Sequence, residues 1–151
     1  MILAKDQAMV SRTYILLVLS VLALPLLQEV PHASTRCPVT DKEIDDASSY
    51  MDAVTSRVKQ TSTCSGAYRI MDACQFGTSG DNELADIVQF KCEPLFMPTA
   101  SHRLKVIYRK ALNRCDDIAK KNDGTMYMSF AAVCRAKTSQ DFAARYKKSR
   151  H

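Results

Sequence analysis

Histidine is scarce in this chain, with three residues among 151. His32 lies in a segment that we expect to be removed on export, and His151 is the last residue, so only His102 is placed to serve a site. The chain also lacks the GxSxG nucleophile elbow, the HExxH zinc motif and a phosphate-binding loop. These absences argue against reactions that need paired histidines, and no enzyme activity is predicted.

Metal-binding patterns are missing as well. The gaps between successive cysteines hold 26, 9, 17, 22 and 18 residues, so no close CxxC pair of the kind that binds zinc is present. Neither glycine-containing loop carries the acidic residues of a calcium-binding EF-hand. The acidic pairs Asp45-Asp46 and Asp116-Asp117 are expected to be solvated helix faces, and no metal or cofactor is predicted.

The chain has no apolar run long enough to cross a membrane. Tyr14–Leu27 is uncharged but spans only fourteen residues and contains Pro25, whereas a spanning helix needs roughly 20 apolar residues. Lys5 and Arg12 precede this run. A positive start followed by a short apolar stretch is typical of a secretory signal peptide, which we predict for residues 1–33.

The cleavage site near Ala33 departs from the usual pattern. Signal peptidase prefers small residues at the last and third-last positions of the leader, and those third-last positions are Pro31 or His32 here. An uncleaved N-terminal anchor therefore remains the alternative, and it is the one route by which a membrane would be a partner. Residues 34–151 are predicted to form one domain.

All six cysteines follow the leader, at Cys37, Cys64, Cys74, Cys92, Cys115 and Cys134. An even number of cysteines behind a signal peptide predicts three disulfides, formed in an oxidising compartment. The alternative is six buried thiols in a cytosolic protein. The combination favours a secreted, extracellular protein that is rich in cysteine.

Apolar residues recur at spacings of three and four, and no stretch alternates with period two, so the sequence predicts an all-α domain of five to six helices. The expected helices are 41–61, 66–75, 82–92, 101–121, 125–137 and 140–148. Thr40 and Glu43 fit a capping box. Further caps are expected at Asp81, at Ser101 or Thr99, and at Ser139. The inward side chains are expected to be Ile44, Ala47, Met51, Val54 and Val58 in the first helix, and Met126, Tyr127, Phe130, Val133 and Cys134 in the fifth.

Six cysteines allow 15 pairings, and helix geometry favours one of them. Cys37 and Cys64 flank a helix about 30 Å long, too far apart for a disulfide. A hairpin at residues 122–124 brings Cys115 level with Cys134. A turn near Ser79 likewise brings Cys64 close to Cys92, which leaves Cys37 with Cys74.

Charge is unevenly distributed along the predicted domain. Residues 34–99 hold 6 basic and 10 acidic groups, and residues 100–151 hold 13 basic and 4 acidic groups. The candidate basic binding face consists of Arg103, Lys105, Arg109, Lys110 and Arg114. Such a face attracts anionic partners, although a simple solubilising surface is the alternative. Nucleic acid is not expected, since aromatic and basic residues are not interleaved.

Two functions are favoured by this profile, and a secreted enzyme is the less favoured third. The first is a secreted binding protein that recognises an extracellular protein or an anionic surface through the basic helical face. The second is an extracellular carrier of small apolar ligands, with a cavity between helices. Five methionines could line such a cavity because methionine adapts to irregular shapes: Met51, Met71, Met97, Met126 and Met128.

Overall fold

The computed structural model describes residues 36–148, and these contain helices and no strand. The elements are α2 (Asp41–Asp45), α3 (Tyr50–Gln60), α4 (Cys64–Cys74), α5 (Asp81–Cys92), the 3-10 turn η1 (Glu93–Leu95), α6 (His102–Lys120) and α7 (Thr125–Lys148). The predicted all-α class is confirmed. The predicted leader, its cleavage site and His151 lie outside the described residues.

Two of the predicted caps form as expected. The Thr40 hydroxyl accepts from the Glu43 amide, and the Glu43 carboxylate accepts from the Thr40 amide, which completes a capping box. Ser101 caps α6, with its hydroxyl accepting from the Leu104 amide at 3.2 Å. Both interactions join residues three positions apart, so they depend on local sequence alone.

The prediction of one helix over 41–61 is wrong, because the chain breaks between α2 and α3. Ser49 adopts an extended conformation, and its side chain accepts from the Asp52 amide. Serine therefore starts a second helix instead of continuing the first, as its preference for N-caps predicts. Met51, expected to face the core, is 41% exposed.

The predicted helices 125–137 and 140–148 are one continuous helix, α7, so this prediction is also wrong. Ser139 was expected to cap the second of them, but it is completely buried within α7. Its hydroxyl donates to the Arg135 carbonyl at 2.9 Å and lies 2.8 Å from the Tyr108 hydroxyl. Because the hydroxyl is satisfied inside the bundle, the helix has no reason to end there.

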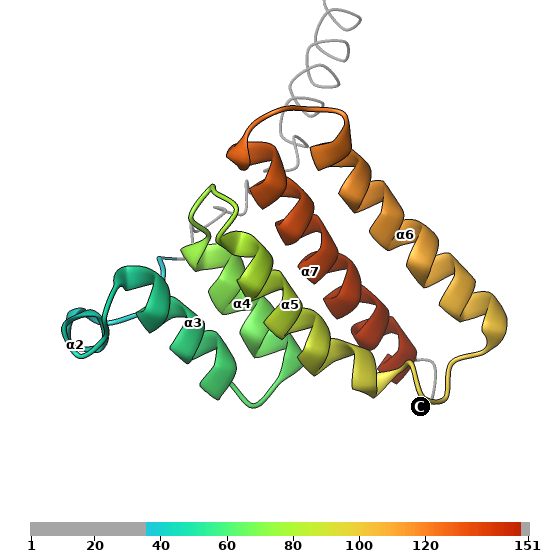
Figure 1. The fold of residues 1–151 in the computed structure, drawn as a ribbon. Helices are drawn as coiled ribbons and strands as arrows, with labels where there is room; N and C mark the ends of the chain where they lie inside the picture. The colour runs from blue at the N-terminus through green and yellow to red at the C-terminus, as the bar shows by residue number, and fades with distance from the viewer. Residues whose placement is uncertain (1–35, 149–151) are drawn as a thin grey trace, which may run out of the picture. The chain divides into compact units, whose positions relative to one another are not determined.

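The buried face of α7 also differs from the prediction. Its buried residues are small: Ser129, Ala131, Ala132, Ala136, Ser139 and Ala143. The larger Met126 and Phe130, expected to point inward, are exposed. In Figure 1, α7 runs between α6 on one side and α4 and α5 on the other. Small side chains let a central helix approach several neighbours at once, which favours alanine over methionine and phenylalanine there.

Three disulfides join neighbouring parts of the bundle. Cys37 pairs with Cys74, Cys64 pairs with Cys92, and Cys115 pairs with Cys134. These are the pairs that the turn geometry predicts. The first ties the segment before α2 to the end of α4, the second links α4 to α5, and the third holds the α6–α7 hairpin.

Aromatic rings fill the core where α6 and α7 meet the segment after η1. Phe96 and Tyr108 pack edge to face, with centroids 5.0 Å apart, and the Phe142 ring lies 5.1 Å from that of Tyr108. Phe96 is completely buried, although it lies between two prolines where the sequence predicted no element. Within residues 36–148, no helix combines the length and the apolar character that crossing a bilayer requires.

Candidate binding surfaces

α6 lies at one edge of the bundle and packs along α7 (Figure 1). Its completely buried residues are Tyr108 and Cys115, and Cys115 is bonded to Cys134 of α7. The opposite side of α6 is open to solvent. The solvent-facing side of α6 therefore forms a long surface whose position is fixed by the packing of α6 on α7.

The predicted basic residues lie on this outward side of α6. Arg103, Arg109, Lys110 and Arg114 are exposed, and Lys105 is half-buried. At 3.6 residues per turn, positions 103, 110 and 114 share one edge of the outward surface, and positions 105 and 109 share the other. These five residues are called the α6 basic face below.

The residues of the α6 basic face form no ion pair with any residue in the range 36–148. Other cations do have carboxylate partners, as in Lys59–Glu83 and Lys137–Asp141. Three carboxylates of the C-terminal half are already engaged: Asp116 with Arg135, Asp117 with Lys121, and Asp141 with Lys137. Part of the uneven charge of the sequence therefore persists in the folded molecule as uncompensated positive charge on α6.

An apolar side chain lies among the three basic residues Arg103, Lys110 and Arg114, which share one edge of α6. Ile107 is 47% exposed and lies four residues after Arg103 and three before Lys110, on the same edge of α6. This edge therefore offers a hydrophobic contact flanked by cations. An isolated exposed isoleucine is ordinary on protein surfaces, and here it adds an apolar contact point to a charged surface.

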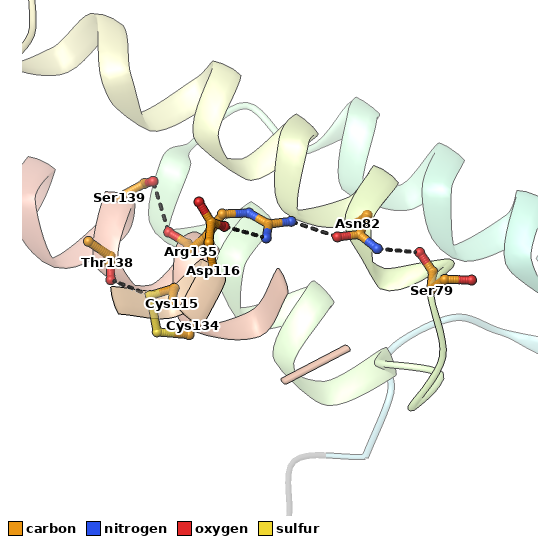
Figure 2. Close-up of polar contacts among 8 residues, drawn as sticks. All are labelled: Ser79, Asn82, Cys115, Asp116, Cys134, Arg135, Thr138 and Ser139. Carbon is orange, nitrogen blue, oxygen red and sulfur yellow. Dashed lines mark hydrogen bonds and ion pairs between the residues drawn. A yellow bond between two sulfur atoms is a disulfide. The ribbon is translucent and has the colours of Figure 1, made fainter. Parts of the chain in front are cut away.

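A polar network anchored on Arg135 fixes α6 against the rest of the bundle (Figure 2). The Arg135 guanidinium donates to Asp116 Oδ1 at 3.1 Å and to Asn82 Oδ1 at 2.6 Å. The Asn82 amide in turn donates to the Ser79 carbonyl at 2.8 Å. One side chain of α7 thus connects α5 to α6. Asp116, predicted to lie on a solvated helix face, is 37% exposed, and its carboxylate is also paired with the more deeply buried Arg135 side chain.

Tyr108 makes a second polar connection inside the same interface. Its hydroxyl donates to Glu93 Oε1 at 2.8 Å and lies the same distance from Ser139 Oγ. Burial raises the pKa of Tyr108 above its ordinary value, and the hydrogen bond to the Glu93 carboxylate raises it further. The phenol therefore stays protonated at physiological pH and joins α6 to η1 and α7.

His102, the one histidine that sequence placed near a potential site, is exposed in the first turn of α6. It does not line the groove described next. Among residues 36–148, no group of three or more histidine, cysteine or acidic side chains is arranged to hold a metal ion.

A groove of about 750 Å³ opens at one end of the bundle. It is bounded by the α3–α4 loop with the first turn of α4, by the end of α5 with η1, and by the last turns of α7. Its lining consists of Ser62, Thr63, Cys64, Ser65, Lys91, Leu95, Gln140, Ala143, Ala144, Tyr146 and Lys147. This end groove is not predictable from the sequence, since its walls come from three separate segments without a shared motif.

The methionines do not gather around the end groove, as none is among its lining residues. Met71 is completely buried in the core, whereas Met51, Met126 and Met128 are exposed at separate places in the chain. Their helical spacing therefore reflects core packing and surface exposure rather than a shared pocket.

No protein-family model, no curated protein and no solved structure matches this chain.

Proposed function

We propose that this protein is a secreted binding protein that recognises an anionic extracellular partner through the α6 basic face. The observation that carries the proposal is the lack of internal ion pairs for these five cations within residues 36–148. Their positive charge is not used to stabilise the described fold, so it is available to a partner.

The rigidity of α6 supports this role. The Cys115–Cys134 disulfide, the Arg135–Asp116 ion pair and the Tyr108–Glu93 hydrogen bond hold its inner side. A surface that is already ordered loses less conformational entropy on binding than a flexible loop does. Ile107, exposed between the basic residues, favours an acidic protein surface with an apolar contact point, because hydrophobic contact adds to charge pairing.

Export is supported by two independent features of the chain. Residues 1–33 have the charge and length pattern of a signal peptide, and three disulfides are typical of oxidising compartments. Were the leader retained, the domain would stay tethered to a membrane.

The decisive experiment compares two variants that lose the same charge at different places. The first replaces Arg103, Arg109, Lys110 and Arg114 with glutamine, and the matched control does the same for Arg36, Lys42, Lys59 and Arg69. Full-length precursor is expressed in exporting cells, and the secreted product is titrated with heparin as a soluble polyanion at several salt concentrations. Four exposed ion pairs at about 0.2–1 kcal/mol each amount to about 0.8–4 kcal/mol, so we expect at least about a fourfold loss for the α6 variant and little change for the control.

The wild-type affinity should fall as salt increases, because exposed charges are screened by ions. If both variants lose affinity equally, binding depends on net charge and the α6 basic face is not the site. Unchanged binding by the α6 variant would reject the proposal outright. The salt dependence of the α6 variant should be shallower than that of the control.

A further inference from the structure

The end groove combines apolar and positively charged surface. Leu95 is 58% exposed and lines the groove together with Ala143 and Ala144 of α7. Lys91 and Lys147 lie among the same lining residues, one on α5 and one on α7. No aspartate or glutamate of the described chain lines it. The groove is therefore suited to a molecule with one apolar part and one negative group.

The walls of the end groove are held in place by contacts that a ligand would not need to form. The Cys64–Cys92 disulfide joins the start of α4 to the end of α5. Tyr146 Oη donates to Thr99 Oγ1 at 2.8 Å, which ties the last turns of α7 to the segment before α6. Such a preformed site requires little reorganisation on binding.

The position of Lys91 is also fixed. Its ammonium group donates to the Lys59 carbonyl at 2.8 Å. No carboxylate of the described chain forms an ion pair with Lys91. An ammonium group has three donors, so two remain for an anionic ligand. The volume of about 750 Å³ is within the usual range of about 300–1,000 Å³ for small-molecule sites.

We propose that the end groove binds a small, soluble amphipathic anion, meaning an apolar body that carries a carboxylate, sulfate or sulfonate group. The acidic group is held by Lys91 and Lys147, and the apolar body lies against Leu95, Ala143 and Ala144. This site is independent of the α6 basic face, since the two share no residue. A membrane surface is the competing occupant, and the experiment separates the two.

The test uses a matched pair of fluorescent probes. The anionic probe is 8-anilinonaphthalene-1-sulfonate, and the neutral probe is N-phenyl-1-naphthylamine, which has the same aromatic body without the sulfonate. Each is titrated into the folded, disulfide-bonded secreted protein. We expect saturable binding to one site and a clear preference for the anionic probe.

Adjacent lysines provide the control variants. Lys147→Gln removes a charge that lines the groove, whereas Lys148→Gln removes the same charge one residue outside it. We expect Lys147→Gln to weaken the anionic probe by about threefold to fivefold and to leave the neutral probe unchanged. Lys148→Gln should change neither, and the four-residue glutamine variant of the α6 basic face should bind both probes normally.

Two further variants test the apolar wall. Ala144→Leu places a larger side chain at the groove and should weaken both probes, and Leu95→Ser should do the same by removing apolar contact. Circular dichroism and thermal unfolding show which variants are folded. If Ala144→Leu does not fold, Leu95→Ser is used to test the apolar wall.

Three results would overturn the proposal. The first is equal affinity for the two probes, and the second is an equal loss in Lys147→Gln and Lys148→Gln. The third is binding to vesicles of anionic phospholipid that depends on Lys147 without saturable binding of the soluble probe, which would assign the groove to a membrane surface.

Discussion

Arg135 of α7 donates to Asp116 of α6 at 3.1 Å, and the same guanidinium reaches Asn82 of α5. The two contacts use different nitrogens of one planar group (Figure 2), so Arg135 sets the spacing of three helices at once. Because α6 carries the proposed binding face, this mostly buried arginine supports binding by holding α6 in place. It is not proposed to contact the partner itself.

Replacing Arg135 with methionine should lower the free energy of unfolding by about 2 kcal/mol, because hydrogen bonds to charged groups contribute about 1.5–3 kcal/mol each and burial is incomplete. Urea unfolding measures the loss. A double-mutant cycle with Asp116→Asn isolates the interaction between the two residues. Strict additivity in that cycle would mean that the ion pair contributes nothing measurable.

Asp81 should be among the most sensitive polar residues in the protein. Its buried carboxylate accepts from the Phe76 and Gly77 amides at 2.8 and 3.0 Å and from Ser129 Oγ at 2.6 Å. Asp81→Asn removes the charge and one acceptor, so we expect a loss of about 2–3 kcal/mol. Ser129→Ala removes one partner only and serves as the milder comparison. Equal stability of Asp81→Asn and wild type in urea would contradict this assignment.

This carboxylate also corrects a sequence-based expectation. Asp81 was expected to cap α5 from outside, but it is the first residue of the helix, and Gly80 precedes it without a side-chain cap. The carboxylate is directed to the loop amides instead, so it organises the turn between α4 and α5.

Stability should decrease at alkaline pH because of two tyrosines, of which Tyr108 is buried and Tyr68 is half-buried. Burial raises the pKa of Tyr68 to about 12 from 10.0, with Asp72 adding to the shift. Burial raises the pKa of Tyr108 as well. A raised folded-state pKa means that this contribution is fully present below pH 10.0 and is lost as the pH rises toward the folded-state value.

Thermal unfolding measured between pH 9 and pH 12 checks this expectation. The melting temperature of wild type should fall across about pH 10–12, and Tyr68→Phe and Tyr108→Phe should each reduce the slope. Tyr127→Phe is the control, since the Tyr127 ring packs against the exposed Phe130 and not in the core. Identical slopes in all three variants would show that the phenols of Tyr68 and Tyr108 are not responsible.

The Cys115–Cys134 disulfide should stabilise the fold and preserve the binding surface. The cysteines lie 19 positions apart in the sequence, and the chain-entropy model gives about 3 kcal/mol for a loop of this size. Replacing both with alanine should lower stability by about that amount and weaken heparin binding. The variant lacking Cys37 and Cys74 should lose comparable stability with less effect on heparin, because that disulfide is remote from α6. A larger effect on heparin in the second variant would contradict the proposed role of α6.

Features were predictable from the sequence where the interacting residues lie close together along the chain. The Thr40 capping box and the Ser101 cap follow from residues three positions apart, so local sequence was sufficient. The disulfide between Cys115 and Cys134 was predictable because a single turn sets which residues of two adjacent helices are level. Local steric and hydrogen-bonding preferences determine such features.

Ser139 shows where local reasoning is insufficient. Serine favours helix starts, but this one remains inside α7, where its hydroxyl lies against that of Tyr108, 31 residues away in sequence. Because Ser139 is buried in this tertiary contact, it lies inside a helix and not at a helix start. The exposure of Phe130 has a related cause, since α7 meets its neighbours through small residues.

The sequence alone was sufficient to predict an all-helical, three-disulfide domain and the concentration of basic residues on one helix. Periodicity, cysteine spacing and charge are patterns of residues along the chain, so they can be seen without knowledge of the tertiary structure. Only the tertiary structure decided which charges are neutralised and where a groove forms. Asp116 is paired with Arg135, 19 residues later, while the α6 basic face has no such partner in the described chain. The end groove is formed by three segments that become adjacent only when the helices pack.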